Sequence, residues 1–297
     1  MIRLVAPHWG WGNRRSRGLP LSVDQTLVVV SPHLDDAVFS LGATLAEAAR
    51  KEMAVINLTV FAGDPSSGAR PSNWDRKAGF PSAGAAARAR RAEDAAACAL
   101  VGMTPVWLPF LDHPYRGDHR DIDHTEVWSA VKPVVKRADL VLVPGFPLDH
   151  PDHAWVTRLI YEHEEELGSI GQYVEQPYAE LEWSGQRRVP EREPLLVGPR
   201  RESISWTRSF PSASAWVLKQ RALLRYSSQL RAIASPSARL LARTALSELA
   251  RGGEYLAVPE RLLATATTER DDAYVVTDRM NDRSKHRAMG RSETVDS

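Results

Sequence analysis

The sequence contains little cysteine, almost no net charge and no long apolar run, and each absence removes a class of protein. Its single cysteine, Cys98, lies in the alanine-rich segment AAACAL, which excludes an intramolecular disulfide and a cysteine-cluster metal site. The 38 basic and 37 acidic residues leave a formal net charge of +1, which gives no electrostatic reason to expect nucleic acid or an anionic membrane as a partner. No stretch of about 18 apolar residues is present, so we expect no membrane span.

What remains is the composition of an ordinary globular protein. Of its 297 residues, 43% are hydrophobic and 25% are charged. The N-terminus lacks the apolar core of roughly 7–15 residues that a signal peptide needs, so we expect a cytoplasmic protein. We expect one domain over 21–270, with its motifs at about 25–165 and an extension at 166–270. The ends at 1–20 and 271–297 are predicted to be flexible.

Strand-like and helix-like segments alternate through the first half of the chain. This alternation predicts an α/β fold: a Rossmann-like, doubly wound, mainly parallel sheet with helices on both faces. A smaller and less regular C-terminal extension follows, with a strand expected within 172–183 and a single helix over 212–233. The strands of the first half are expected at 26–30, 53–63, 104–110 and 138–145, and the helices at 35–51, 85–102, 124–138 and 153–167.

A first cluster of ionisable residues stands where the first strand gives way to a helix. The segment SPHLDDAVFSLG (31–42) places His33, Asp35 and Asp36 directly after the apolar run TLVVV. Aspartates at a helix N-terminus also serve as caps and complement the helix dipole, so this cluster by itself does not decide between structure and chemistry.

A second cluster of the same kind follows the fourth strand. The segment GFPLDHPDHAW (145–155) carries His150 and His153, with Asp149 before them and Asp152 between them. Capping by Asp152 is again the structural alternative. Because the carboxyl ends of parallel strands meet at one edge of a sheet, we expect the two clusters to lie together.

Pooled, the two clusters hold three histidines and four carboxylates, which is the donor set of a mononuclear zinc site. A catalytic Zn²⁺ takes three protein ligands and keeps one position for water. Two adjacent aspartates can then divide the work, because one can bind the metal while its neighbour accepts a proton. Asp149 or Asp152 could orient a ligand histidine from behind.

Substrate contacts are expected from two polar loops beside these strand ends. The loop at 63–84 is rich in Gly, Ser and Pro and should overhang the ligand side. Its Trp74, and Trp155 beside the second cluster, could stack on a sugar ring, although tryptophan more often packs in a core. The loop at 113–124 is interpreted as polar and substrate-facing rather than as a second metal site. Asp112, Tyr115 and Arg116 are its candidate sugar-binding residues, with surface polarity as the alternative.

The two clusters together resemble the motifs of the PIG-L/LmbE family of zinc-dependent N-deacetylases. The family's first motif is usually His-Pro-Asp-Asp-Glu; here it reads HLDDA (33–37), so Leu34 and Ala37 differ. The second, His-x-Asp-His, is intact as HPDH (150–153). A helix segment RRAE (90–93), followed by Gly102, is similar to the family's Arg-x-x-Glu…Leu-Gly helix. The resemblance spans roughly 25–165, about half the chain.

The resemblance implies a ligand set and a base. By it, His33, Asp36 and His153 would hold a Zn²⁺ ion. Asp35 would be the general base that takes a proton from the attacking water.

It also implies roles for three further side chains. His150 would stabilise the tetrahedral oxyanion or protonate the leaving amine, Asp152 would hold His150, and Arg90 would contact the sugar of a small-molecule substrate. The expected activity is removal of an acetyl or other acyl group from an amino sugar or its conjugate. An amidase acting on a larger conjugate, such as the S-conjugate of a thiol cofactor, is one alternative. A nucleotide-binding Rossmann protein is the other, although SPHLDD replaces the glycine-rich turn that it would need.

Overall fold

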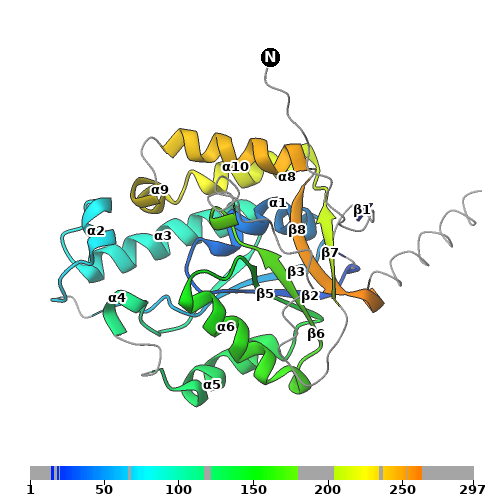
Figure 1. Ribbon diagram of the computed structural model, residues 1–297, viewed down its shortest axis with the longest axis horizontal. Helices are drawn as coiled ribbons and strands as arrows, with labels where there is room; N and C mark the ends of the chain where they lie inside the picture. The colour runs from blue at the N-terminus through cyan, green and yellow to red at the C-terminus, as the bar shows by residue number, and fades with distance from the viewer. Residues whose placement is uncertain are drawn as a thin grey trace, which may run out of the picture.

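A computed structural model of the chain describes residues 15–16, 19, 21–65, 68–116, 122–179, 204–233, 237–251 and 253–262. Its centre is an eight-stranded sheet with the order β1-β7-β8-β6-β5-β2-β3-β4 (Figure 1). The strands are β1 (Arg15–Ser16), β2 (Thr26–Ser31), β3 (Ala54–Thr59), β4 (Thr104–Trp107), β5 (Leu140–Phe146), β6 (Ser169–Val174), β7 (Ile204–Ser209) and β8 (Glu254–Pro259).

The half of the sheet that carries the motifs is parallel throughout. Strand β2 pairs with β3 on one side and with β5 on the other, β3 continues to β4, and β5 continues to β6. Strand β8 alone runs antiparallel to both of its neighbours, β6 and β7. The predicted α/β fold with a mainly parallel sheet is therefore confirmed.

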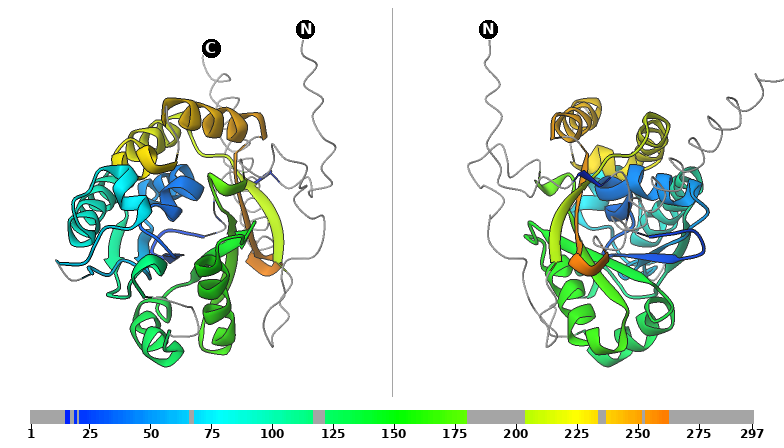
Figure 2. Two further views of the ribbon diagram at one scale, coloured as in Figure 1. Left: turned by 60° about the vertical axis from the view of Figure 1, so that its left-hand side comes forward. Right: turned by 90° about the vertical axis from the view of Figure 1, so that its right-hand side faces the viewer.

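Helices cover both faces of the sheet (Figure 2). On one face α1, α3 and α8 close a core with residues such as Leu27, Leu45 and Leu140, and on the other α5 and α6 close a second core with Val28, Val141 and Ile160. The helices are α1 (Asp36–Arg50), α2 (Asn73–Ala78), α3 (Ala83–Val101), α4 (His113–Arg116), α5 (His124–Val135), α6 (Pro151–Glu162), α8 (Ala213–Leu223), α9 (Ser227–Ile233) and α10 (Ser237–Arg251), with a short 3₁₀ helix at Glu164–Glu166.

The order of the strands reverses direction along the chain between β2 and β5. From β2 the chain winds outward through β3 to β4, and it then returns to place β5 on the other side of β2. In open α/β sheets ligands bind at such a switch point, beyond the carboxyl ends of the strands. Both motifs follow these two strands, so the fold brings them together at that edge.

The segment 63–84 differs from the predicted long loop because it contains a helix of its own. Ser72 caps α2, and its hydroxyl accepts a hydrogen bond from the Asp75 amide at 3.1 Å. Gly79 ends the helix with a left-handed φ of 90°. The sequence SNWD carried this signal, since a Ser three residues before an acidic residue is typical of a helix start.

The predicted helix over 212–233 is wrong in one respect, because the chain breaks it into α8 and α9. The break exposes Leu224 and turns Tyr226 inward, where its buried hydroxyl donates to Asp94 Oδ1 at 2.7 Å. The strand expected within 172–183 ends at Val174. Helix α10 and strands β7 and β8 were not predicted. Of the two ends predicted to be flexible, 271–297 lies outside the described residues, and 1–20 does so except for β1 at 15–16 and residue 19. Within the described part of the chain, every helix is too short or too polar to cross a membrane.

Candidate functional site

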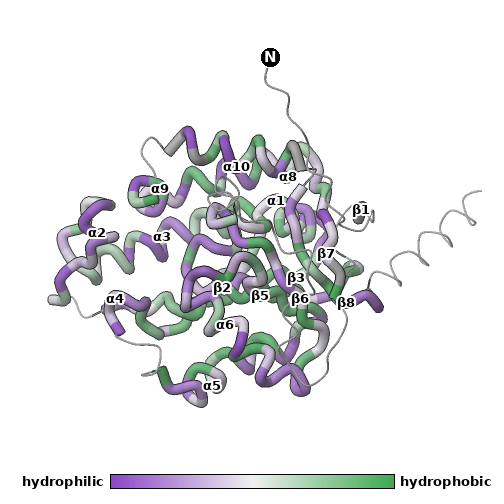
Figure 3. Tube along the Cα trace, in the orientation of Figure 1, coloured by the Kyte–Doolittle hydropathy of each residue, from purple (hydrophilic) through white to green (hydrophobic). Residues whose placement is uncertain are grey.

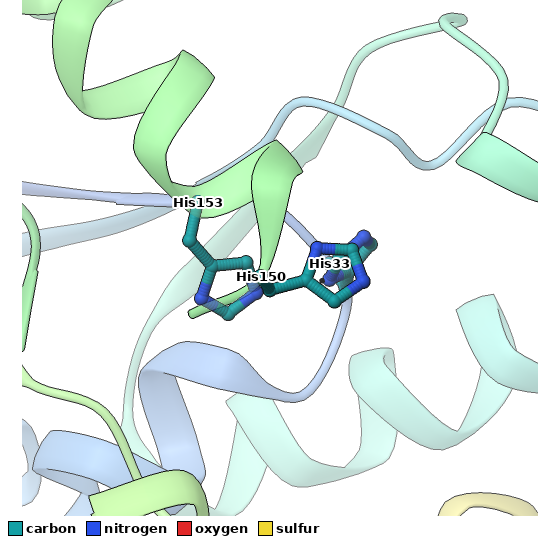
Figure 4. A group of neighbouring side chains, drawn as sticks. All are labelled: His33, His150 and His153. Atoms are coloured by element: carbon teal, nitrogen blue, oxygen red, sulfur yellow. Dashed lines mark hydrogen bonds between the residues drawn. The ribbon is translucent and has the colours of Figure 1, made fainter. Parts of the chain in front are cut away.

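Three side chains from the two motifs meet at one point beyond the ends of β2 and β5 (Figure 4 draws the histidines). His153 Nε2 lies 3.3 Å from His33 Nδ1 and 3.4 Å from Asp36 Oδ2. The third side of this triangle, from His33 Nδ1 to Asp36 Oδ2, is 3.5 Å. The backbone amide of His33 also donates to Asp36 Oδ2 at 2.8 Å, which fixes the carboxylate.

The triangle has the size that a tetrahedral metal ion requires. Ligand atoms at 2.0–2.1 Å from a Zn²⁺ ion lie about 3.3–3.4 Å from one another. The three side chains of the triangle therefore fit a divalent cation as they stand.

Each histidine of the triangle has a carboxylate beside its other ring nitrogen, the one that does not face the triangle. His153 Nδ1 lies 2.7 Å from Glu175 Oε2, and both side chains are buried. His33 Nε2 lies 3.1 Å from Asp152 Oδ2 and 3.4 Å from Asp112 Oδ1. A carboxylate behind a ligand histidine fixes the ring and its tautomer.

Glu175 is a residue that sequence reasoning missed. It follows β6, which pairs with β5, so it belongs to the same edge of the sheet as the second motif. The run QYVEQPY offered one signal, an acidic residue at the end of a strand. Asp152, expected to orient His150, and Asp112, expected to bind sugar, both also place a carboxylate against His33, which sequence reasoning did not anticipate.

Charge around the triangle shifts the protonation of its members. Burial lowers the pKa of His33, but the neighbouring carboxylates of Asp112, Asp152 and Asp36 outweigh this and raise it above its usual range. Burial opposes ionisation of Asp36, yet the imidazoles of His153 and His33 bring its pKa down to about 2. The site therefore attracts positive charge, which a metal ion would supply in place of protons.

Asp35 stands beside the triangle without joining it. It occupies the position before the first residue of α1, but its side chain makes no capping hydrogen bond to the helix. Burial and the adjacent Asp36 carboxylate raise its pKa to about 7. Its carboxylate lines the pocket described below.

His150 caps α6 and faces the same pocket. Its Nδ1 accepts a hydrogen bond from the Asp152 backbone amide at 3.2 Å, so the cap is His150 rather than Asp152. This bond leaves Nε2 as the nitrogen that carries the proton. The ring centre lies 4.9 Å from that of His33 and 5.0 Å from that of His153. Burial, together with these imidazoles, lowers the pKa of His150 to about 4, so the ring is neutral near pH 7.

Arg116, which the sequence suggested as a sugar-binding residue, does not line the pocket. Its guanidinium pairs with the Asp152 carboxylate and lies over the Phe61 ring, 4.1 Å from the ring centre. The ion pairs to Arg116 and His33, working against burial, hold the pKa of Asp152 well below its usual range.

A pocket of about 470 Å³ opens directly over the triangle, a size typical of small-molecule sites. Of the predicted substrate-binding residues, four line it: Trp74, Arg90, Asp112 and Tyr115. Trp155 does not, since it is buried in the core and donates its indole N–H to His124 Nε2 at 3.1 Å.

Two of these residues are tied to a buried acid that sequence reasoning also missed. Asp75 of α2 is fully buried and contacts both the Arg90 guanidinium and the Tyr115 hydroxyl. The Tyr115 oxygen in turn accepts from the Ser72 amide at 2.8 Å. These contacts fasten the segment 63–84 to α3 and α4 as one wall of the pocket.

A further bond joins that wall to the C-terminal extension. The Trp74 indole N–H donates to Gln229 Oε1 of α9 at 2.8 Å, and both residues line the pocket. Segments far apart in the sequence therefore close over the site together.

Comparisons with known proteins bear on the family and the fold. Residues 28–163 match the model of the PIG-L family, described as GlcNAc-PI de-N-acetylase. A search of curated proteins found no match to the sequence.

Solved structures of deacetylases share the fold over most of the chain. A deacetylase of the teicoplanin biosynthesis pathway has 25% sequence identity and a TM-score of 0.64, covering 79% of this chain and 97% of its own. The A40926 pseudoaglycone deacetylase Dbv21 has 26% identity and a TM-score of 0.63, covering 82% and 97%. The zinc-inhibited form of teicoplanin deacetylase Orf2 has 25% identity and a TM-score of 0.63, covering 79% and 97%.

The fold, the family match and these structures together define an enzyme of the deacetylase/amidase class. Within that class, residues 28–163 match the PIG-L family.

Proposed function

We propose that this enzyme is a Zn²⁺-dependent hydrolase that removes an N-acetyl or other acyl group from an amino sugar carried on a larger conjugate. The observation that carries the proposal is the triangle of His33, Asp36 and His153, whose edges of 3.3–3.5 Å fit a tetrahedral ion at the floor of a pocket.

The chemistry explains why such an enzyme needs a metal. An amide is a poor electrophile and its amine a poor leaving group. A Zn²⁺ ion in the triangle would make water nucleophilic near neutral pH and polarise the amide carbonyl.

Asp35 then acts as the general base. Its carboxylate lines the pocket next to the ligand Asp36 and is not engaged in capping α1, so it can accept a proton from the attacking water. Asp36 cannot easily do this work, because binding a cation uses up its basicity. The proton held by Asp35 is then available for the departing nitrogen.

His150 stabilises the oxyanion. Because the Asp152 amide occupies Nδ1, the proton sits on Nε2 of a ring that lines the pocket. A neutral N–H donor in that place lowers the energy of the negative oxygen that develops on the carbonyl. Asp152 positions His33 through its carboxylate and His150 through its backbone.

The substrate class follows from the pocket and from the neighbours. An acetyl group alone would leave most of about 470 Å³ unfilled, so the pocket has room for a sugar ring beside it. Arg90, Asp112, Tyr115 and Trp74 offer the polar and aromatic contacts that a sugar uses. One similar structure is a deacetylase of the teicoplanin biosynthesis pathway and another is the deacetylase of the A40926 pseudoaglycone, which supports a larger conjugate as the substrate here.

The proposal is tested by acetate release from a panel of N-acetylated sugars, glycosylated natural products and S-conjugates of thiol cofactors. We expect release from at least one amino-sugar conjugate, its loss on chelation and its recovery with Zn²⁺. Release from S-conjugates alone would replace the substrate class with the amidase alternative. Stoichiometric Zn²⁺ binding without hydrolysis of any member would overturn the proposed reaction.

A further inference from the structure

The near-zero net charge of the chain hides a strongly basic segment. Residues 213–251, which form α8, α9 and α10, contain one acidic residue, Glu248, and that side chain is buried. The rest of the chain is therefore net acidic. The basic residues of the segment are Lys219, Arg221, Arg225, Arg231, Arg239, Arg243 and Arg251.

These three helices form an outer layer of the molecule. Helix α8 packs on α1 and α3, and all three helices lie together at the upper edge of the views in Figures 1 and 2. Lys219 is buried, whereas five arginines of the layer are exposed: Arg221, Arg225, Arg231, Arg239 and Arg243.

The layer also exposes nonpolar side chains, which is unusual beside so much charge. Figure 3 shows hydrophobic and hydrophilic residues alternating along α10. Six large hydrophobic residues are exposed among the described residues, and four of them belong to this layer: Val217, Leu224, Leu246 and Leu249.

Two leucines of helix α10 face outward, although Leu241 of the same helix packs against the core. Leu246 and Leu249 are 66% and 61% exposed, whereas Thr244 and Glu248 are buried. On the inner side of α10, Glu248 pairs with Lys219 of α8, with Nζ–Oε distances of 2.8 and 3.1 Å. This pair and the packing of Leu241 hold that side of the helix inward, and the two leucines point to the outside.

We propose that this layer, α8–α10, docks onto an anionic lipid surface. Arginines attract anionic headgroups, and aliphatic side chains between them can enter the boundary of the acyl chains. Nucleic acid fits less well, because bases stack on aromatic rings and the exposed nonpolar residues here are all aliphatic. A second copy of the chain fits less well too, since it would bring the same positive charge.

Docking would also place lipid next to the pocket. Helix α9 connects α8 and α10 in the chain and contributes Gln229 and Ile233 to the pocket lining. A substrate with a nonpolar part could then reach the site from the lipid surface.

The test is co-sedimentation of the full chain with vesicles of phosphatidylcholine alone and of phosphatidylcholine mixed with phosphatidylglycerol. We expect binding to the anionic vesicles only, and weaker binding at high salt. Arg221→Glu/Arg225→Glu should lower the partition coefficient at least about thirtyfold, since each basic residue near an anionic surface contributes about a factor of five. Leu246→Ser/Leu249→Ser should lower it roughly tenfold or more.

Matched controls lie outside the layer. Val23→Ser removes an exposed nonpolar side chain, and Arg137→Glu reverses an exposed charge after α5. Both should leave partitioning unchanged, and circular dichroism should show the same fold for all variants. No binding of the folded wild type, or equal losses in the controls, would overturn the proposal. So would a dimer that the layer variants split, or preferential binding of single-stranded RNA.

Discussion

Two of the buried clusters of charged side chains in the described part of the chain differ in where the balancing charge comes from. In one, Lys219 contacts Glu248 and Glu254 at 2.6–3.1 Å. Glu254 also accepts from the Ala43 and Thr44 amides of α1. This cluster supplies its own cation and is closed to the pocket.

The other cluster is the triangle at the sheet edge. Its atoms are two imidazole nitrogens and a carboxylate oxygen, and they turn toward one another. The comparison shows how a structural ion pair differs from a binding site. The first is complete when the chain folds, whereas the second, under the proposed function, would be completed by a metal ion from solution.

The largest expected effect is on proton transfer at the triangle of His33, Asp36 and His153, which we call the open cluster. Asp35→Asn keeps the shape of the side chain but removes the base, so kcat should fall by on the order of 10²–10⁴. Metal content, measured by atomic absorption, should stay near wild type. His153→Ala is the paired variant and should lose the metal instead. Loss of metal in Asp35→Asn, or normal metal content in His153→Ala, would show that the roles are divided incorrectly.

The cluster of Lys219, Glu248 and Glu254, which we call the closed cluster, should affect the stability of the fold rather than the activity. Lys219→Met leaves two carboxylates buried without their cation, so we expect the free energy of unfolding to fall by about 3–5 kcal/mol. Urea unfolding measures it. The matched control is Lys132→Met, which breaks an exposed pair with Glu166 and should cost about 0–1 kcal/mol. Equal losses in the two variants would remove the distinction between the clusters.

A smaller effect is expected at Glu175, the carboxylate that contacts His153 of the triangle. Glu175→Gln keeps an oxygen for the Leu148 amide but weakens the hold on His153 Nδ1, so metal affinity should fall about 10–100-fold. Competition with a chelator of known affinity measures this. Glu47→Gln, an acid whose contacts are to Ser212, is the control. Unchanged metal affinity in Glu175→Gln would mean that the contact from Glu175 to His153 does not contribute to metal binding.

The smallest expected effect concerns Asp94, a buried acid that belongs to neither cluster. Burial raises its pKa from 3.8 to about 6, although hydrogen bonds from Trp107, Tyr226 and Cys98 oppose the rise. The folded state therefore favours the protonated form, and this contribution to stability is lost as the pH rises through about 6. Between pH 5 and pH 8 it should amount to about 1 kcal/mol. Urea unfolding should show this loss in the wild type and not in Asp94→Asn; equal pH dependence in both would contradict the assignment.

The sequence predicts the open cluster well because its geometry is simple. Parallel strands end at one edge, so two motifs that each follow a strand must meet there, as His33 and His153 do. The parallel half of the sheet was predictable for a related reason, since apolar β-branched runs alternated with helix formers.

The partners of the motifs were harder to predict because they depend on tertiary packing. Glu175 reaches His153 only through the pairing of β6 with β5, and Asp75 reaches Arg90 only through the fold of the segment 63–84. The break between α8 and α9 depends on the hydrogen bond that the Tyr226 hydroxyl donates to the Asp94 carboxylate. The outward position of Leu246 and Leu249 on α10 depends in part on the buried pair of Lys219 and Glu248, which the periodicity of nonpolar residues does not reveal.

The position of Glu175 in the chain bears on how the protein could be divided. The family match ends at residue 163, and the carboxylate that orients a motif histidine comes twelve residues later. Gln229, which binds the wall of the pocket, comes later still. We therefore expect the smallest active fragment of this enzyme to extend beyond residues 28–163, which match the PIG-L family. Variation in the extension can reshape the pocket while the motif residues stay as they are.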